Sequence, residues 1–398
     1  MNAAYSTTSI STDRVSSSQS ERLFAIDLLR GLLMVLMAID HARDFWSATP
    51  YRPEDLTQAS ISLFLTRWVT HLCAPTFVLL AGLSAYLLGK KTGDRRGLSR
   101  FLLTRGLWLM LLDATLLTLN WEFAYQFIFL QVIWVIGCSM VLLAGLIWLP
   151  RWAIATFALV LIAGHNALDG WQPEPASAWW TLLHQQNVIM LGAQWPPIFV
   201  AYPLLPWPGV MAAGYWLGSL FDLPESVRNR WLSRLGGLLL LGFVVLRFIN
   251  QYGDPHPWQT QPRGLFYTIL SFVNVTKYPP SLLYLTLMLG IALLLLSRID
   301  NLRGGLRQVL LVYGRVPLFF YVVHIFFLHA LAALWTYFQY GKALNLMFDK
   351  PQTWPAAYAP NLVRVYGIWL ITLVFMYYAC RWYGNIKRRY NYPWLSYL

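Results

Sequence analysis

About ten stretches of this chain are apolar enough and long enough to cross a lipid bilayer, since a spanning helix needs roughly 20 apolar residues. Of the 398 residues, 57% are hydrophobic and only 12% are charged. Soluble domains usually carry about 25% charged residues. The sequence therefore predicts an all-α, polytopic transmembrane bundle of about 10 helices, near residues 23–43, 68–89, 101–121, 126–149, 152–168, 197–220, 231–250, 279–297, 309–338 and 361–384.

Lysine and arginine are distributed unevenly between the predicted connections. The formal net charge is +13, but the basic residues lie in short loops between apolar runs, which indicates control of topology rather than nucleic-acid binding. If the N-terminus is inside, 18 of the 30 basic residues fall in inside segments, 8 in outside segments and 4 within spans. Because basic residues favour the cytoplasmic side, both termini are expected in the cytoplasm.

The distribution of polar and apolar residues along the chain suggests a simple domain organisation. Residues 1–21 are rich in Ser and Thr and contain no apolar run, so we expect a disordered polar tail. Residues 22–398 are expected to form a single transmembrane domain. The three cysteines, at positions 73, 138 and 380, lie in apolar stretches without metal-ligand spacing and are expected to pack as small hydrophobes.

The first span carries ionisable side chains, which are costly inside a bilayer. Arg30 and His41 are eleven positions apart, so on a helix they face the same way, about 16 Å from each other. Asp27 lies three positions before Arg30 and can pair with it. Ionisable groups on one face of a spanning helix indicate a functional site, in which Arg30 would hold an anionic or carbonyl-bearing substrate. The structural alternative is an ion pair that only fixes helix packing.

The outer end of the first span holds the best candidate for a general base. Histidine titrates near neutral pH and is the side chain most often used in this role. His41 adjoins Asp40, and His71 opens the second span, so we expect the two imidazoles to approach each other. We predict His41 as the catalytic residue, with Asp40 orienting it and His71 as second choice. The alternative is an interfacial histidine that caps the span.

Two later spans also carry ionisable residues. Asp113 lies in the middle of the third span and needs a partner, either a histidine, a basic residue of the first span, or a structural contact. His324 and His329 in the ninth span are five positions apart, so they face about 140° from each other. We therefore expect one of them to line a cavity and the other to pack.

Prolines interrupt two of the predicted spans. The sequence 201–209 contains three prolines, which must disrupt the sixth span, and Pro317 predicts a kink or a break in the ninth. A broken helix at membrane depth is tolerated where it is buried in protein or lines a wet cavity. We find no glycine-rich phosphate loop, metal-ligand cluster or Gly-x-Ser-x-Gly motif, so no metal is expected.

Several runs of residues resemble those of a known family. They are Arg-Leu-Phe-Ala-Ile-Asp-Leu-Leu-Arg-Gly (22–31), Met-Ala-Ile-Asp-His-Ala-Arg-Asp-Phe (37–45) and His-Leu-Cys-Ala-Pro-Thr-Phe-Val-Leu-Leu-Ala-Gly (71–82). Further similar runs are 202–209, 276–283, 314–321 and 394–398. Together they resemble the bacterial branch of the heparan-alpha-glucosaminide N-acetyltransferase family.

This resemblance implies a polytopic enzyme that takes an acetyl group from cytoplasmic acetyl-CoA and places it on a sugar outside. Arg30 and His41 also resemble the Arg-x10-His pattern of the related type 3 membrane acyltransferases, in which the histidine is held to be catalytic. Arg100 and Arg105 resemble in position the bases thought to contact CoA there. One departure concerns the animal lysosomal branch, whose active histidine is thought to lie in the first luminal loop, because residues 44–66 here contain no histidine.

The favoured hypothesis is acyl transfer across a bacterial cytoplasmic (inner) membrane. Acetyl-CoA or another acyl-CoA would bind Arg100, Arg105 and Arg315 from the inside, and the acyl group would reach His41 past Arg30, Asp27, Asp113 and His324. An external carbohydrate would accept it, either directly or through an acyl-histidine. Alternatives are a transporter of a small anion or lipid, and a lipid-linked glycosyltransferase that uses the acidic pair at positions 54 and 55. The large aromatic spans suggest a homodimer.

Overall fold

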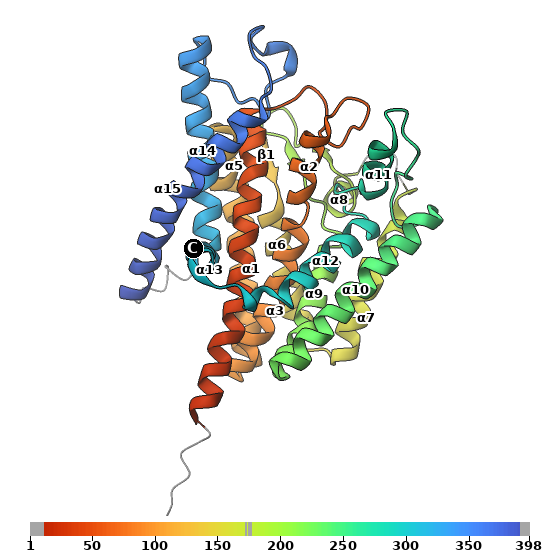
Figure 1. Ribbon diagram of the computed structural model, residues 1–398, viewed down its shortest axis with the longest axis vertical. Coiled ribbons are helices and arrows are strands. Elements are labelled where there is room, and N and C mark those ends of the chain that lie inside the picture. The colour runs from red at the N-terminus through yellow and green to blue at the C-terminus, as the bar shows by residue number, and fades with distance from the viewer. Residues whose placement is uncertain (1–11, 172, 174–176, 391–398) are drawn as a thin grey trace, which may run out of the picture.

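The computed structural model describes residues 12–171, 173 and 177–390 (Figure 1). The chain is 70% helical, which confirms the predicted all-α membrane fold. The first 11 residues and the run 394–398 lie outside the described residues. Among the residues described, seven helical segments are long and apolar enough to cross a membrane: Ile61–Thr92, Arg95–Glu122, Arg151–Leu168, Glu225–Ile249, Leu282–Asn301, Pro317–Tyr340 and Leu362–Arg389.

The first half of the chain contains the helix that carries His41. This helix, α1, begins at Thr12, so it includes part of the stretch predicted as a polar tail. The boundary of the transmembrane domain at residue 22 stays a prediction. The elements are α1 (Thr12–Trp46), α2 (Ile61–Thr70), α3 (Cys73–Thr92), α4 (Arg95–Leu112), the π-helix η1 (Asp113–Leu117), α5 (Thr118–Glu122), β1 (Ile128–Leu130), α6 (Val132–Leu146), α7 (Arg151–Gly164), η2 (His165–Leu168) and α8 (Ala178–Leu183).

The second half returns along the first and ends in a long helix. In Figure 1, α1 rises from the lower end of the molecule and α15 runs back downward, so the C-terminal end of α1 and the N-terminal end of α15 lie toward the same side. The elements are β2 (Asn187–Ile189), β3 (Ile198–Val200), α9 (Trp207–Leu217), η3 (Gly218–Asp222), α10 (Glu225–Ile249), α11 (Leu265–Val273), α12 (Leu282–Leu296), η4 (Ile299–Asn301), α13 (Gly304–Gly314), α14 (Pro317–Tyr340), η5 (Pro351–Thr353) and α15 (Leu362–Arg389).

Two predicted spans begin later than expected because their first residues form a small sheet. β1 pairs in parallel with β3, and β2 pairs antiparallel with β3, in the order β1-β3-β2. The run from Tyr202 to Pro206 then turns, and α9 begins only at Trp207. Proline has no N–H to donate to a helix, and the sheet satisfies backbone groups that a broken helix would leave unpaired. The predicted disruption of the sixth span is therefore confirmed.

The ninth predicted span is also broken. Helix α13 ends at Gly314 and α14 begins at Pro317, which occupies the first turn where its missing N–H costs nothing. The two intervening residues, Arg315 and Val316, connect the helices. This break agrees with the prediction, and it brings Arg315 to the side of α1 because α13 packs along that helix.

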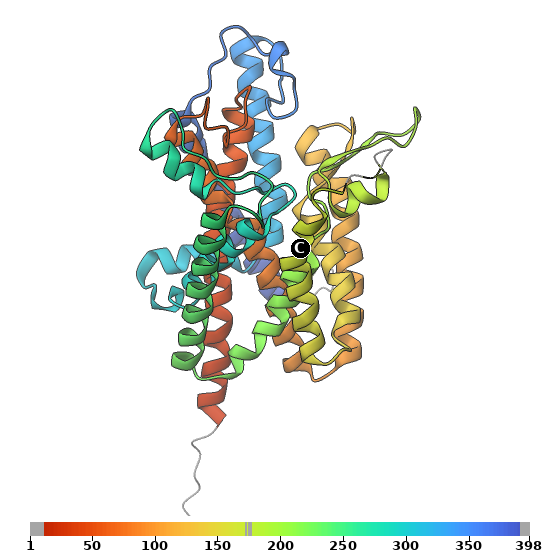
Figure 2. The same ribbon diagram turned by 90° about the vertical axis from the view of Figure 1, so that its right-hand side faces the viewer.

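The helices form two groups that meet along α3. Figure 2 shows α4, α6 and α7 on one side of the molecule and α1, α10 and α14 on the other. Helix α3 contacts members of both groups, including α9, α4, α1 and α12. Helix α3 therefore lies at the junction of the two groups.

Glycines allow the closest helix contacts. A Cβ atom at Gly31 on α1 would lie 2.0 Å from the carbonyl oxygen of Leu310 on α13, and one at Gly314 would lie 1.8 Å from that of Asp27. Glycines at helix crossings are common in membranes, where close van der Waals packing holds helices together. The contact fixes α13, and the Arg315 that follows it, against the part of α1 that carries Arg30.

We predict that Gly31→Ala destabilises the protein by roughly 1–3 kcal/mol, because the added methyl group overpacks the α1–α13 crossing. The measurement is the unfolding temperature of the purified protein in detergent. The control is Gly237→Ala on α10, where an added Cβ meets nothing within 4 Å. Equal unfolding temperatures for Gly31→Ala and the control would contradict the packing argument.

Candidate active site

His41 on α1 forms a hydrogen-bonded pair with His324 on α14. His41 Nδ1 lies 2.7 Å from His324 Nε2, and the two rings stack with centroids 5.0 Å apart. His324 Nδ1 lies 2.8 Å from the carbonyl oxygen of Phe320. A carbonyl only accepts hydrogen bonds, so His324 carries its proton on Nδ1 and its Nε2 accepts from His41 Nδ1–H. This arrangement leaves the lone pair of neutral His41 on Nε2.

A cavity of about 430 Å³, here called the outer cavity, contains His41 in its wall. The ring of Trp121 lies edge-on to His41 at 4.9 Å between centroids, and that of Tyr321 at 6.0 Å. Within the described chain, His41 Nε2 has no protein hydrogen-bond partner. The geometry therefore gives His41 an unprotonated nitrogen at the edge of a space where a small molecule fits.

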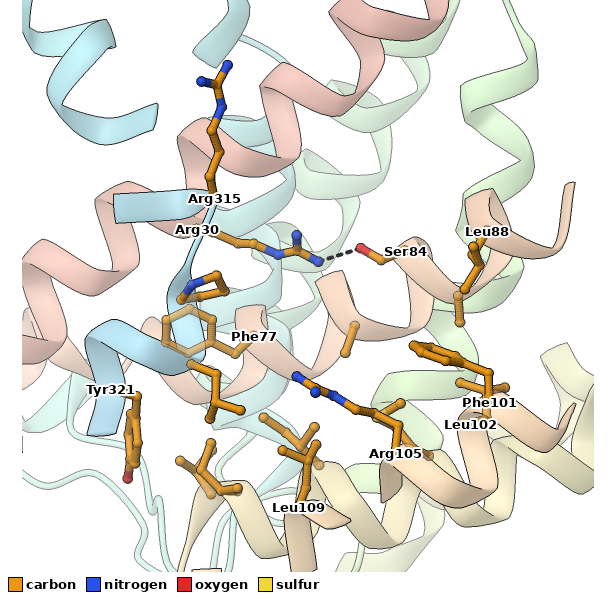
Figure 3. A pocket seen from close by; sticks show the side chains of 18 of the residues that line it. Arg30, Phe77, Ser84, Leu88, Phe101, Leu102, Arg105, Leu109, Arg315 and Tyr321 are labelled. Carbon is orange, nitrogen blue, oxygen red and sulfur yellow. Dashed lines mark hydrogen bonds between the residues drawn. The ribbon is translucent and has the colours of Figure 1, made fainter. Parts of the chain in front are cut away.

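A second cavity of about 350 Å³, here called the inner cavity, lies between α1, α3, α4, α6 and α14. Figure 3 shows the guanidinium groups of Arg30 and Arg105 reaching into it, whereas Arg315 at its edge points away. Arg30 donates to Ser84 Oγ at 2.6 Å and lies 3.4 Å from Asp27. The lining contains no acidic side chain among the described residues, so it suits an anionic molecule.

The inner and outer cavities adjoin each other. Phe77, Val132 and Tyr321 line both of them. At its other end the inner cavity adjoins a third cavity of about 450 Å³, here called the inner vestibule, since Arg315 and Lys387 line both. Arg381 and Arg388 also line the inner vestibule. Together the cavities lead from a cluster of basic residues near the end of α15 to the imidazole of His41.

Five of the predicted site residues line none of these three cavities: Asp27, His71, Arg100, Asp113 and His324. Arg100 is exposed on α4 and does not line any of them. Asp113 is fully buried, but it contacts neither Arg30 nor a histidine, because its Oδ2 accepts from the backbone N–H of Gln131 at 2.8 Å. Gln131 in turn accepts from the Tyr321 hydroxyl at 3.0 Å. Asp113 therefore positions Gln131 in the wall of the outer cavity but does not line that cavity itself.

Asp40 and His71 belong to an ionic network at the outer end of α1, not to the His41 pair. Asp40 accepts from Arg43 at 2.9 Å and also from Arg67. Arg67 reaches Glu54 at 2.7 Å, and His71 lies 3.5 Å from the same carboxylate. The expected approach of His71 to His41 is not found, and His324 takes that place. Although burial raises the pKa of Glu54, Arg67 and His71 hold it well below its usual range.

The two histidines of α14 have different surroundings, but neither lines one of the cavities described, so the prediction that one of them lines a cavity stays a prediction. His324 pairs with His41, whereas His329 stacks between Phe45 at 4.8 Å and Phe123 at 3.8 Å. The sequence analysis did not single out Arg67, Ser84, Trp121, Gln131, Lys277 or Tyr321 as site residues. The only signals for Lys277 and Tyr321 were their positions in the family-like runs 276–283 and 314–321. The others carry no local signal because they meet only in the folded chain.

The fold and cavities define a helical integral membrane protein in which spaces from two sides converge on one histidine. The model of the family described as "Heparan-alpha-glucosaminide N-acetyltransferase, catalytic" matches residues 22–245, more than half of the chain. The chain therefore belongs to this family, which makes it a membrane acetyltransferase. No curated protein matches the chain. Its assignment to the bacterial branch stays a prediction.

We predict that Glu54→Gln lowers the unfolding temperature at pH 7 and flattens its dependence on pH. A carboxylate whose pKa falls on folding stabilises the folded state above its unfolded pKa, and loses that effect as the pH falls through its folded pKa. The wild-type protein should therefore lose more stability than the variant as the pH falls from about 5, just above the unfolded pKa of Glu, to about 3. Glu225→Gln, at an exposed carboxylate on α10, is the control, and an unchanged pH profile in Glu54→Gln would contradict the argument.

Proposed function

We propose that this protein moves an acetyl or other acyl group from cytoplasmic acyl-CoA to a hydroxyl or amine of an extracytoplasmic sugar or glycan, with His41 as general base. The observation that carries the proposal is that His41 lines the outer cavity next to Tyr321, a residue that this cavity shares with the basic inner cavity. The family match supports the acetyl transfer, and the bias of Lys and Arg supports cytoplasmic termini in a bacterial inner membrane. The homodimer stays a prediction.

The donor binds from the basic side. Its phosphates pair with the inner vestibule, where Arg315, Arg381 and Lys387 gather positive charge. Its thioester arm lies along the inner cavity past Arg30 and Arg105, and the thioester carbonyl ends near Tyr321, at the junction of the two cavities. Arginine binds phosphate and carbonyl oxygens through several N–H donors, so Arg30, fixed by Asp27 and Ser84, guides the arm.

The acceptor enters the outer cavity and loses a proton to His41. As its oxygen or nitrogen attacks the thioester carbonyl, its proton moves to His41 Nε2. The tetrahedral intermediate then expels the CoA thiolate, which takes the proton from His41 and leaves as CoA thiol. His324 accepts from His41 Nδ1–H throughout, so it holds the required tautomer. In this proposal Asp40 and His71 shape the outer cavity through the ionic network, and Asp113 does so through Gln131.

An acyl-histidine intermediate uses the same nitrogen as nucleophile. In that variant Nε2 attacks the thioester first, and the acceptor attacks the acyl-imidazole afterwards. A burst of CoA release before steady turnover would favour it over direct transfer. Release of CoA thiol also separates the proposal from a transporter, and dependence on a polyprenyl-phosphate sugar would favour a glycosyltransferase.

We predict that His41→Asn lowers the rate of acetyl-CoA-dependent transfer by about 10²–10⁴-fold, the usual contribution of a general base. His324→Phe should lower kcat by at least about tenfold with little change in KM, because the tautomer of His41 is no longer fixed. The measurement is thiol release by the purified protein, and His329→Asn, at the packed histidine of the same helix, is the control. Wild-type rates in His41→Asn would remove His41 from the mechanism.

We predict that Arg315→Gln raises the KM for acetyl-CoA by roughly tenfold, since a charge-assisted hydrogen bond contributes about 1.5–3 kcal/mol. Arg105→Gln should act in the same direction. The Arg315 change should leave the KM for an acetyl thioester without phosphates, such as S-acetylpantetheine, unchanged, whereas the Arg105 change should raise it, because Arg105 lies along the thioester arm in this proposal. Arg100→Gln, on the exposed face of α4, serves as the matched control. A larger effect at position 100 than at position 315 would move the donor site away from the inner vestibule.

A further inference from the structure

The hairpin formed by β2 and β3 begins and ends at the outer cavity. Gln186, directly before β2, lines that cavity, and so does Phe199 in β3. The two strands pair antiparallel as far as Ile189 and Ile198, and residues 190–197 form the tip that connects them. Figure 2 shows this tip, in yellow-green, projecting away from the bundle on the side of α4, α6 and α7. The hairpin therefore connects the wall of the outer cavity with the surroundings of the protein.

The base of the hairpin is packed, whereas its tip is exposed. Val200 is fully buried and Ile189 is nearly so, in a small apolar core at the sheet. At the tip, Met190 is 72% exposed, Trp195 is 68% exposed and Leu191 is 47% exposed. Exposed groups of large apolar side chains often mark a surface that binds a membrane or another molecule.

The hairpin carries no charged side chain. Residues 175–221, which include it, contain no Asp, Glu, Lys or Arg. Two other long loops at the outer end differ, because 251–264 contains two charged residues and 341–361 contains three. Interfaces between soluble proteins usually have a polar rim, whereas a lipid surface disfavours charged side chains that enter it. The composition of the hairpin therefore favours lipid as its partner.

Exposed apolar side chains lie on both sides of the hairpin. On one side, Trp179 belongs to α8, which contacts β2, and its ring lies 5.6 Å from that of Trp171 between centroids. Both tryptophans are about half exposed, and tryptophan is enriched where a membrane meets water. On the other side, β1 contacts η1, and the spanning segment Arg95–Glu122 around η1 exposes Leu116 and Leu119. The surface that faces lipid therefore extends to the hairpin.

The backbone of the tip limits how deep it can lie in a membrane. Loop N–H and C=O groups find no partners in the hydrocarbon core, so lipid-exposed loops do not occur there. At the level of the lipid headgroups, water satisfies these groups while apolar side chains still reach the edge of the acyl chains. The headgroup level of the leaflet is therefore the position that satisfies both the backbone and the side chains of the tip.

We propose that the tip, residues 190–197, lies at headgroup level in the leaflet on the side of the outer cavity, and that the acceptor is a sugar linked to a membrane lipid. This proposal rests on the proposed acyl transfer, and it names the acceptor as lipid-borne rather than free in solution. The sugar of such a lipid stays at headgroup level. Because the base of the hairpin forms part of the cavity wall, the hairpin holds the outer cavity next to these sugars.

The position of the tip is tested by fluorescence quenching in nanodiscs of phosphatidylethanolamine and phosphatidylglycerol. Met190→Cys is labelled with a nitrobenzoxadiazole dye, and some lipids carry a spin label on the acyl chain; the three native cysteines are buried. We expect at least about twofold more quenching at position 190 than at Gln352→Cys, on an exposed loop at the outer end. Leu238→Cys, exposed on the spanning helix α10, is the control for a lipid-facing site.

The acceptor class is tested by thiol release from acetyl-CoA in the same nanodiscs. Hexadecyl glucosaminide in the membrane and methyl glucosaminide in solution present the same sugar hydroxyl and amine groups. We expect kcat/KM to be at least about tenfold higher for the membrane-borne sugar, because confinement raises its effective concentration at the cavity. Met190→Asp should lower the rate with that sugar by at least about fivefold and leave the rate with methyl glucosaminide unchanged. Met190→Leu and Gln352→Asp should behave like the wild-type protein with both sugars.

The outcomes separate this proposal from the proposed function. Quenching at position 190 no greater than at position 352 would overturn the position of the tip. A tip covered by a second copy of the chain would give that result, together with cross-linked dimers of Met190→Cys. Equal kcat/KM for the two sugars, or an equal loss with both in Met190→Asp, would overturn the lipid-borne acceptor. An absence of thiol release with either sugar would contradict the acyl transfer itself, and the quenching would still test the tip.

Discussion

One hydrogen bond, from His41 Nδ1 to His324 Nε2, determines what the site can do. The carbonyl oxygen of Phe320 fixes the proton of His324, and His324 then fixes that of His41. Without these two hydrogen bonds either ring nitrogen of His41 can carry the proton, and His41 cannot act as the base whenever Nε2 is protonated. The bond also joins α1 to α14, so the packing of these two helices sets the chemical state of the imidazole.

Several other polar groups inside the helical bundle also have hydrogen-bond partners, since each unpaired polar group in a membrane interior costs several kcal/mol. Asp113 Oδ2 accepts from the N–H of Gln131, and the prolines before α9 stand beside a small sheet that pairs the neighbouring backbone. Through such contacts, buried polar groups position the residues that form the walls of the outer cavity. Other charged side chains line the cavities, among them Arg30, which also pairs with Asp27 and Ser84.

The sequence predicted what depends on a single helix and missed what depends on contacts between helices. The shared face of Arg30 and His41 follows from helix periodicity, and the breaks at the proline runs follow from the missing N–H. The partner of His41 did not follow, because His71 is near in sequence whereas His324 is 283 positions away.

The inner and outer cavities differ in the charge of their linings. The inner cavity and inner vestibule have basic linings without acidic side chains among the described residues, which suits a molecule carrying several phosphates. The outer cavity mixes Arg52, Arg67 and Lys277 with Asp40 and Asp44, so its lining is less uniformly basic. In the proposed transfer, a polyphosphate donor is therefore favoured on the side of the inner cavity. Because the two linings differ, exchanging the proposed donor and acceptor between the two sides would cost binding energy.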